Sequence, residues 1–439
     1  MIIPLHIGQM PLSRLAKLLG NTWEWEGGDT APKRLVTDSR EIERGDIFCA
    51  LQGKRDGHLF ARQAEERGAR CIIAERKTEA CIPHILVKHT PFALLQWARA
   101  SLEGHSCLKI AITGSIGKTT TKEKCASLLE NAFRTHKSQG NFNNCLGVSF
   151  SVLSMPKDTE ALVLEFGMNQ EGEIARLSQA VCPDIAIITN IGFAHIGNLG
   201  SREAIAKAKR EILLGMKKDA PLFIPANEPL LFPCRSRSAS HTVLPFEDEE
   251  LEGLGVVPPK DIGEKWGLSF AYALGAFLGI EDALLRKWLT EAAKTPVRRK
   301  TVYIQGVTLI DDSYNASPES VVAALDFLAL QEGARKIAVL GSMLELGRDA
   351  PLYHRAIARH AALCADVLFF FGEEKDAVAS GAIGGGMKRD AVFLFDSAEE
   401  AKRALLPFVR VGDAVLCKAS HGMGASSLSE ALVKKFSHE

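Results

Sequence analysis

Short apolar runs alternate with amphipathic stretches along the chain in three successive blocks. In the first block, residues 46–51 and 71–74 are apolar runs that predict strands, and residues 60–67 predict a helix between them. A further helix begins at Pro91 and reaches about Leu102. Strands alternating with helices are typical of α/β architecture, so we expect a small α/β domain over residues 1–103.

The second block repeats this alternation after a short linker at residues 103–106. Strands are expected at residues 108–113, 161–164 and 184–189, and helices at 121–133, 267–278 and 281–293. Strands separated by helices predict a parallel sheet. A proline and a basic cluster at residues 294–300 mark a hinge, so we place the second domain at residues 104–297.

The third block restarts the pattern and predicts a Rossmann-like α/β domain over residues 298–439. Strands are expected at residues 307–310, 336–340, 366–371, 391–395 and 414–416, with a helix at 318–330. The glycine-rich segment 381–386 (GAIGGG) is expected to be a flexible loop.

The strongest chemical signal is the glycine-rich segment TGSIGKTTT at residues 113–121, which follows an apolar strand and opens a helix. In this context backbone N–H groups surround the oxygens of a polyphosphate. Lys118 would bridge the β- and γ-phosphates, and the Thr119 hydroxyl would reach Mg²⁺. Ile112 stands where the longer phosphate-loop pattern has glycine, so this is the shorter TGxxGKT form. The alternative, a chance glycine turn, does not explain the Lys-Thr-Thr at the helix start.

Two polar residues follow neighbouring apolar strands of the second block. Glu165 ends one strand and is placed to bind Mg²⁺ beside Thr119, because Mg²⁺ favours carboxylate and hydroxyl oxygens. His195 follows the next strand, where its imidazole would bind a second divalent ion or hold a water molecule. An exposed strand end for Glu165 and a hydrogen-bonded core histidine for His195 are the structural alternatives.

Two polar clusters and one lysine run are open to both structural and functional interpretations. Residues 139–147 (QGNFNNCLG) form either an asparagine-rich turn or a set of amides that positions a carboxylate-bearing substrate. Residues 311–318 (DDSYNASP) either cap a helix or hold a ribose or base. Lys207 and Lys209 fall on a predicted helix, where lysines usually form a solvated face, so the pattern alone gives them no role.

Composition narrows the class of protein. The 53 basic and 53 acidic residues balance, so we expect neither nucleic acid nor an anionic membrane as a partner. No run of 18 apolar residues occurs, and the N-terminal stretch does not resemble a signal peptide. The ten cysteines are scattered without a CxxC pair, which favours free thiols in a reducing cytoplasm. No ligand pairs have the spacing that zinc sites use, so the pattern argues against a zinc site.

With these residues assembled, the chain resembles the Mur ligase family over nearly its whole length. The stretches that carry the resemblance are VTDSREIERGDIFCALQGKRDGHLF, TGSIGKTTTKE, GNFNNCLGV, EFGMNQEGEIA, DDSYNASPES and GSMLELG, with the spacing from His195 to Lys209. GNFNN, DDSYNA and the M-x-ELG element favour the family member that adds a dipeptide over the one that adds the third amino acid.

The resemblance implies residue roles that spacing alone does not show. Lys209 aligns with a lysine that is carbamylated in these ligases and helps hold a second Mg²⁺, while Glu165, His195 and Thr119 align with metal-binding positions. The implied ATP-binding residues are Gly114, Ser115, Ile116, Gly117, Lys118, Thr119, Thr120, Arg298, Asp312 and Asn315. The implied substrate-binding residues are Ser39, Arg40 and Lys54 for the UDP-sugar, with Asn141, Asn143, Asn144 and Asn169 near the acceptor. Catalysis is implied for Lys118, Lys209 and His195.

The chain departs from the usual family pattern in three places. It has GSM at residues 341–343 where GDM is usual, and KASH at residues 418–421 where a KGSR-like stretch is common. Residues 262–268 lack the histidine–asparagine pair that the family uses for adenine.

The activity that the resemblance implies is ATP-dependent amide-bond formation between a UDP-N-acetylmuramoyl-tripeptide and D-alanyl-D-alanine, with Mg²⁺, in the bacterial cytoplasm. We expect a monomer. The alternatives are a sister ligase that adds the third amino acid, a ligase similar to folylpolyglutamate synthase, and, from another class, a regulatory P-loop ATPase. A regulatory P-loop ATPase would not account for a third α/β domain that carries DDSYNASPES.

Overall fold

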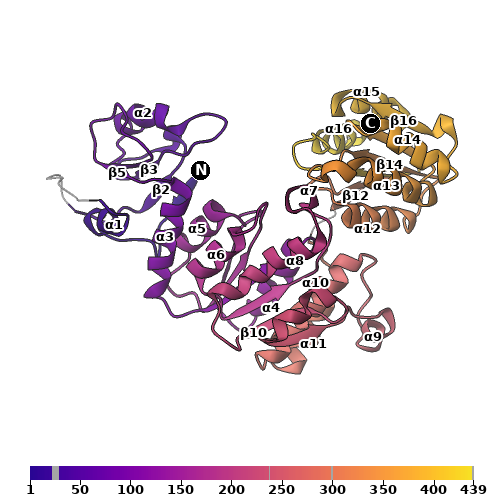
Figure 1. The fold of residues 1–439 in the computed structure, drawn as a ribbon. Coiled ribbons are helices and arrows are strands. Elements are labelled where there is room, and N and C mark those ends of the chain that lie inside the picture. The colour runs from indigo at the N-terminus through magenta and orange to yellow at the C-terminus, as the bar shows by residue number, and fades with distance from the viewer. Residues whose placement is uncertain (22–28, 237, 298–299, 438–439) are drawn as a thin grey trace.

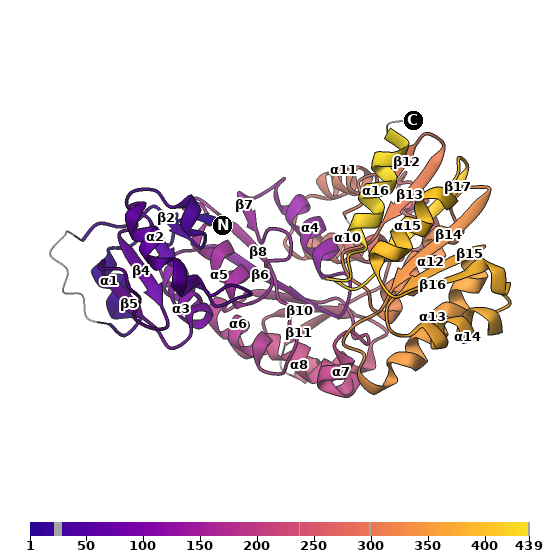
Figure 2. The ribbon, with the colours of Figure 1, turned by 90° about the horizontal axis from the view of Figure 1, so that it is seen from above.

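The structure, a computed structural model, describes residues 1–21, 29–236, 238–297 and 300–437. Within these ranges the chain forms three β-sheets of five, six and six strands, each built by a separate stretch of sequence. The three sheet-bearing units follow one another along the molecule from the N-terminus to the C-terminus (Figures 1 and 2). The α/β class with three sheets is therefore confirmed.

The first unit is built on a small sheet with the strand order β1-β2-β3-β4-β5, in which β1 runs antiparallel to β2 and the other pairs are parallel. Its elements are β1 (Ile2–Pro4), α1 (Leu12–Leu18), β2 (Arg34–Val36), β3 (Ile47–Cys49), α2 (Ala61–Glu66), β4 (Cys71–Ala74), β5 (His84–Leu86) and α3 (Thr90–Glu103). Helix α3 also packs on the second unit. Its Trp97 is fully buried in a core that includes Leu12 of the first unit and Val148 of the second. One continuous core thus joins these two units.

The second unit has six parallel strands in the order β11-β10-β9-β6-β8-β7. Its strands are β6 (Leu108–Thr113), β7 (Thr135–Lys137), β8 (Ala161–Glu165), β9 (Ile185–Ile188), β10 (Pro221–Pro225) and β11 (Ala239–Val243). Its helices are α4 (Lys118–Leu129), α5 (Cys145–Leu153), α6 (Glu173–Val181), α7 (Ile196–Leu199), α8 (Arg202–Arg210), α9 (Asp248–Gly253), α10 (Ile262–Phe277) and α11 (Asp282–Ala293). Side chains alternate between faces along a strand, so Ile110 and Ile112 pack toward α4, α10 and α11, while Ala111 packs toward α5, α6 and α8. Helices on both faces explain why these strands are apolar throughout.

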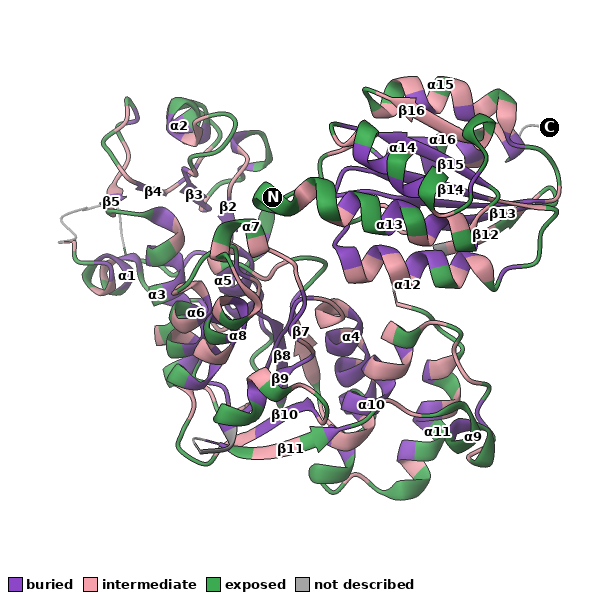
Figure 3. Cartoon of the chain, turned by 45° about the vertical axis from the view of Figure 1, so that its right-hand side comes forward, coloured by how far each residue is buried: buried purple, intermediate pink, exposed green. Residues whose placement is uncertain are grey.

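The third unit has the strand order β12-β13-β17-β14-β15-β16, antiparallel only between β12 and β13. Its elements are β12 (Lys300–Ile304), β13 (Val307–Asp311), α12 (Pro318–Ala329), β14 (Arg335–Gly341), α13 (Ala350–Cys364), β15 (Val367–Phe371), α14 (Lys375–Gly384), β16 (Val392–Phe395), α15 (Ala398–Phe408), β17 (Asp413–Lys418) and α16 (Ser426–Ser437). Helices α12, α13 and α14 share one core with the sheet, and α15 and α16 share another on the opposite face. Figure 3 shows buried strands between helices with exposed outer surfaces.

Two helices of the second unit begin earlier than expected. Helix α4 begins at Lys118 rather than residue 121, because Gly117 takes a left-handed conformation directly before it (φ +78°) and caps the helix. Helix α10 begins at Ile262 rather than residue 267, because the Asp261 carboxylate accepts a hydrogen bond from the Gly263 N–H at 2.7 Å. Both shifts bring a helix start to the edge of the candidate site.

The expected flexible loop at residues 381–386 is wrong. Residues 381–384 complete helix α14, which packs closely against α13. A Cβ added at Gly381 would lie 2.2 Å from the carbonyl oxygen of Arg355 on α13. The glycine therefore permits close approach of two helices. The expected hinge at residues 294–300 includes Arg298 and Arg299, which lie outside the described residues.

Candidate functional site

The glycine-rich loop between β6 and α4 has the backbone shape that phosphate binding requires. Gly114 has φ +152° and Gly117 has φ +78°, values that residues with a Cβ rarely adopt. At Gly114 a Cβ would also lie 1.8 Å from Oγ1 of Thr189. The first N–H groups of α4 have no carbonyl partner within the helix and point out of its N-terminus. The loop and the helix start therefore present donors to an anion.

The carboxyl end of strand β9 holds this loop in place. Oδ1 of Asn190 accepts hydrogen bonds from the backbone N–H groups of Ser115, at 3.0 Å, and Ile116, at 2.9 Å. The Thr189 hydroxyl donates to the carbonyl oxygen of Ile116 at 2.5 Å. The sequence analysis did not single out Thr189 or Asn190. Their place at the end of a strand that pairs with β6 was the signal that could have found them.

Lys118 lies over the loop that precedes it. Its Nζ donates to the carbonyl oxygens of Gly114, at 2.8 Å, and Ser115, at 3.1 Å. The ammonium and the positive end of the α4 dipole are thus close together. This part of the site suits a highly charged anion such as a polyphosphate.

Glu165 brings a buried carboxylate to the start of α4. It is the last residue of β8, the strand beside β6, and it is 2 % exposed. Oε2 accepts a hydrogen bond from the Thr119 hydroxyl at 2.6 Å, and Oε1 accepts one from the Asn143 amide at 2.9 Å. The structure therefore brings together Glu165, Thr119 and Asn143, three of the residues that the sequence analysis selected.

Lys209 does not lie on the solvated face of its helix. It is 1 % exposed on α8, and no hydrogen bond or ion pair joins its amine to another residue of the described ranges. Burial, together with the positive charge of Lys118, lowers the pKa of Lys209 well below the ordinary value of a lysine. Lys207 on the same helix is exposed and forms an ion pair with Glu171 at 2.5 Å. The two lysines of this run thus have opposite environments.

His195 meets an acid from the third unit. Its Nδ1 lies 2.5 Å from Oε2 of Glu345, and both residues have positive φ, +67° and +63°. Non-glycine residues in this conformation cluster at functional sites. Burial and the charge of Lys118 lower the pKa of His195, while the charge of Glu345 raises it. His195 is therefore neither an exposed nor a purely core histidine.

A second acid of the third unit reaches the same loop. Oε1 of Glu319 accepts a hydrogen bond from the backbone N–H of Phe193 at 2.6 Å, and the carbonyl oxygen of Glu345 accepts one from Gly197 at 2.8 Å. The sequence analysis named neither acid individually, although both lie in motifs that it quoted, DDSYNASPES and GSMLELG.

Many of these groups, but not Lys209, Glu319 or Glu345, line a cavity of about 410 Å³ between the second and third units. The second unit contributes the phosphate loop, Glu165, His195, Asn143, Asn169 and the start of α10, including Trp266. The third unit contributes Asp312, Asn315 and Lys418. Lys418 is buried at the end of β17, with its Nζ 2.9 Å from Oδ2 of Asp312 and 2.9 Å from the carbonyl oxygen of Asn315. Trp266 and Lys418 were not among the selected candidates.

The remaining candidates lie elsewhere or have other contacts. Ser39 is buried and donates to Oε1 of Gln63 at 2.6 Å, Arg40 pairs with Asp38 at 2.7 Å, and Lys54 is exposed, all in the first unit. Asn144 caps α5 by accepting from the Gly147 N–H at 3.0 Å, and Asn141 is exposed. None of these five candidates lines the cavity. Arg298 lies outside the described residues.

Comparisons with known proteins all match this chain to Mur ligases. The Mur ligase middle domain matches residues 112–251, and the glutamate ligase domain of Mur ligases matches residues 297–421. The UDP-N-acetylmuramoyl-tripeptide–D-alanyl-D-alanine ligase of Bacillus subtilis is 35% identical, with 91% of this chain and 93% of the relative covered. The enzyme of the same name from Synechocystis is 32% identical, with 92% and 93% covered.

Solved structures agree over the whole molecule. MurF from Acinetobacter baumannii superposes with a TM-score of 0.83 at 26% identity, covering 98% of this chain and 100% of the other. MurF from Thermotoga maritima, solved in complex with ADP, superposes with a TM-score of 0.77 at 29% identity, covering 92% and 98%. Full-length sequence similarity, the two matched domains and the shared fold show that this chain belongs to the Mur ligase family.

Proposed function

We propose that the chain is an ATP-dependent ligase that joins D-alanyl-D-alanine to a UDP-N-acetylmuramoyl-tripeptide. The observation that carries this proposal is one cavity in which Lys118, the pair of Glu165 and Thr119, and Asp312 of another unit face the same space. The curated relatives that cover nine-tenths of the chain are named for this reaction.

The reaction has two steps. The terminal carboxylate of the tripeptide attacks the γ-phosphate of ATP, which forms an acyl phosphate and releases ADP. The amine of D-alanyl-D-alanine then attacks the acyl carbon, and inorganic phosphate leaves as the amide forms and the amine loses a proton. Because oxide is a poor leaving group and phosphate a good one, the protein has mainly to position the reactants and to neutralise charge.

Lys118 and the N–H groups at the start of α4 are assigned to the phosphates. In the proposed complex, Nζ of Lys118 exchanges the carbonyl oxygens of Gly114 and Ser115 for phosphate oxygens. This exchange places a full positive charge where negative charge moves during phosphoryl transfer. Asp312 and Asn315 are assigned to the nucleotide from the third unit. Arg298 is assigned to it on the resemblance alone.

The donor atoms fit the Mg²⁺ that the family implies. Glu165 supplies a buried carboxylate and Thr119 a hydroxyl, 2.6 Å apart, and both are oxygen donors of the type that hard divalent cations prefer. Thr119 and Glu165 would hold one ion, and His195 with carbamylated Lys209 would hold a second. Bound there, such ions neutralise charge on the transferring phosphoryl group.

Lys209 is proposed to be carbamylated. The neutral amine attacks CO₂ and loses a proton, which yields a carbamate with two oxygens. A lysine whose pKa lies well below its ordinary value offers the neutral amine near neutral pH, and Lys209 has that property. Lys209→Ala is expected to lose activity that added bicarbonate does not restore and that acetate or formate restores in part. Lys207→Ala is the matched control, and normal turnover by Lys209→Ala would remove this assignment.

Each substrate is assigned to a different part of the molecule. We propose that residues 1–103 bind the UDP-sugar through Ser39, Arg40 and Lys54, that residues 104–297 bind ATP, and that residues 298–439 close over the nucleotide. Asn143 and Asn169 line the cavity and are assigned to the acceptor, with Asn141 and Asn144 nearby. We also propose, from the resemblance, that the protein is a monomer and that it acts in the cytoplasm. Among the described helices, none is both long and apolar enough to cross a membrane.

A coupled phosphate-release assay tests the function. Release is expected only when ATP, a UDP-tripeptide and D-alanyl-D-alanine are all present, and Lys118→Ala serves as the inactive control. Release with a free amino acid in place of the dipeptide would favour a sister ligase, and release without either substrate would favour a regulatory ATPase. Parallel assays with tripeptides ending in meso-diaminopimelate and in lysine identify the third residue.

A further inference from the structure

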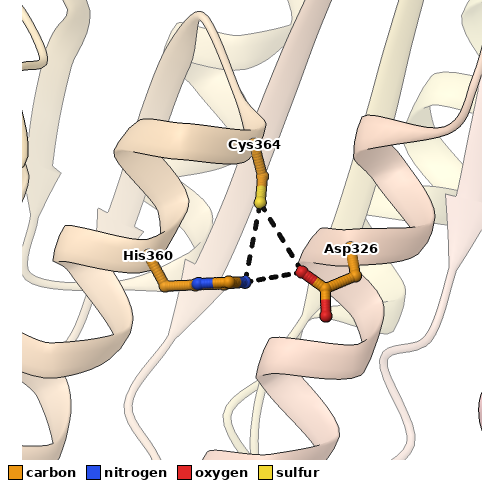
Figure 4. Close-up of side chains that lie close together, drawn as sticks. All are labelled: Asp326, His360 and Cys364. Carbon is orange, nitrogen blue, oxygen red and sulfur yellow. Dashed lines mark hydrogen bonds and ion pairs between the residues drawn. The ribbon is translucent and has the colours of Figure 1, made fainter.

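A group of metal-ligating side chains lies on the third unit, outside the cavity. Asp326 comes from α12, and His360 and Cys364 come from the neighbouring helix α13 (Figure 4). Nε2 of His360 lies 2.6 Å from Oδ1 of Asp326, and Sγ of Cys364 lies 3.6 Å from that nitrogen and 3.8 Å from that oxygen. No role in the proposed reaction involves these three residues.

We propose that Asp326, His360 and Cys364 form a site for a divalent transition-metal cation of the zinc type. One carboxylate oxygen, one imidazole nitrogen and one thiolate sulfur are a donor set that Zn²⁺ accepts. Tetrahedral coordination at ordinary zinc bond lengths separates sulfur from nitrogen or oxygen by about 3.6 Å and nitrogen from oxygen by about 3.3 Å. The sulfur–nitrogen distance of 3.6 Å matches this value and the sulfur–oxygen distance of 3.8 Å is slightly longer, so the main change needed is that the hydrogen-bonded nitrogen and oxygen move apart by about 0.7 Å.

The two helices place the three ligands on a shared surface. His360 and Cys364 are four residues apart on α13, so their side chains lie on one face of that helix. Asp326 lies 34 residues before His360, on the helix packed beside it. The sequence analysis argued against zinc because it found no ligand pairs at the spacing usual for zinc sites. His360 and Cys364 are four residues apart, but the third ligand lies on another helix, so no local pattern shows the full set.

The exposure of the three side chains suits a cation that enters from solvent. The Asp326 side chain is 55% exposed and that of His360 is 31% exposed, while Cys364 is buried beneath them. Sulfur thus forms the floor of the site, and the open side leaves a fourth position for water. On binding, the thiol releases its proton to solvent, and the His360 ring keeps its remaining proton on Nδ1.

A bound cation would join α12 to α13. Helix α12 also carries Ser317 at its N-cap and Ser320 in its first turn, which line the cavity at the other end of the helix. The proposed site therefore stabilises a cavity wall and supplies no group to the reaction. Its failure would leave the proposed function untouched.

Cobalt titration of the full-length, chelator-treated protein in excess Mg²⁺ tests this site. Co²⁺ bound by a thiolate gives a charge-transfer band in the near ultraviolet and tetrahedral bands in the visible, and Zn²⁺ is expected to abolish both by displacement. Cys364→Ser should remove the thiolate band, and His360→Gln or Asp326→Asn should weaken binding at least about tenfold. Cys182→Ser, which alters an exposed thiol elsewhere, is the matched control and should bind as the wild type does.

Melting temperature gives a second measurement that does not depend on the spectrum. Zn²⁺ should raise the melting temperature of the wild type and of Cys182→Ser, but not that of Asp326→Asn. Because the Asp326 side chain is exposed, we expect Asp326→Asn to fold, so a missing zinc effect in this variant would reflect the lost ligand. The proposal is overturned if the wild type shows no thiolate band, or if the cobalt spectra of the wild type and Cys364→Ser are the same. A zinc-induced rise in melting temperature of equal size in wild type and Asp326→Asn would also overturn it.

Discussion

Replacing Lys209 with methionine should make the protein both more stable and inactive. In buffer free of CO₂, the wild type buries an amine that makes no hydrogen bond to another described residue. Burial that removes most of the water from a polar group without supplying a protein partner costs up to about 1–3 kcal/mol, and methionine keeps an unbranched chain of similar length without that cost. In a domain of roughly 150–250 residues, each kcal/mol raises the melting temperature by roughly 2–4 °C. The variant should therefore melt several degrees higher.

The gain in stability should depend on pH with a definite sign. Because the pKa of Lys209 in the folded protein lies well below its ordinary value, the unfolded chain binds a proton here that the folded chain does not bind. Throughout the window between the two pKa values, wild-type stability rises with pH relative to Lys209→Met by up to about 1.4 kcal/mol per pH unit. The advantage of the variant should shrink as pH rises and, above about pH 10.4, the pKa of an unperturbed lysine, level off at the pH-independent cost of the neutral amine.

Urea unfolding at about pH 7, 8 and 9 measures this difference. Lys207→Met is the control, since Lys207 is exposed, pairs with Glu171, and should give no such pH-dependent gain. A Lys209→Met variant less stable than the wild type, or an advantage that does not change with pH, would refute the reasoning. Either result would mean that the wild-type amine is charged and compensated in the folded protein.

Three further tests address other parts of the structure: one lysine variant, one pair of glycine variants and one scattering experiment. Lys118→Ala should lower ATP-dependent phosphate release at least about a hundredfold with unchanged circular dichroism, and a folded variant that keeps most of its turnover would contradict the phosphate-loop assignment. Gly381→Ala should destabilise the protein by about 1–3 kcal/mol in urea because its Cβ would clash with the Arg355 carbonyl. Gly384→Ala, in open space on the same helix, should stabilise it by about 0.5–1 kcal/mol, and equal effects would count against close helix packing. Small-angle scattering should show a smaller radius of gyration when a non-hydrolysable ATP analogue and UDP-tripeptide bind, because we expect the third unit to close by bending near residues 294–300. An unchanged radius of gyration with both ligands bound would exclude such closure.

Local sequence signals predicted much of the fold and the phosphate loop. The central strands of the two larger sheets are short apolar runs that were predicted, whereas β7, β10, β11 and β12 were not predicted. The Gly-Lys-Thr loop depends on residues that are adjacent in sequence. The burial of Lys209 also had a local signal. Ile205 and Lys209 are four residues apart and share the buried face of α8, while Lys207 lies on the other face. This four-residue spacing predicts that Lys209 lies on the buried face, whereas the usual solvation of lysine side chains predicts an exposed one.

Other features depend on contacts that no local pattern encodes. The glycines of residues 381–386 lower helix propensity, so a loop was the natural prediction. Their actual role, close approach to α13, depends on a neighbouring helix. Likewise, Glu319 and Glu345 reach the loop around His195 from 126 and 150 residues away. Such pairings follow from the arrangement of the second and third units.

Lys118, Lys209 and Lys418, three lysines near the cavity of which the last two are buried, differ in how their charge is compensated. The Lys118 ammonium donates to two loop carbonyls, and Lys418 lies against the Asp312 carboxylate. Each of these two ammonium groups is thus held in place by acceptors of the protein itself. An anion that replaces those acceptors meets a charge that is already positioned, which is the most effective electrostatic arrangement for stabilising a reacting phosphate. Lys209 has no acceptor within the described ranges, so burial drives it toward the neutral amine. The same burial that costs stability thus prepares this one lysine for reaction with CO₂, which is why a stability measurement on Lys209→Met bears directly on its proposed chemistry.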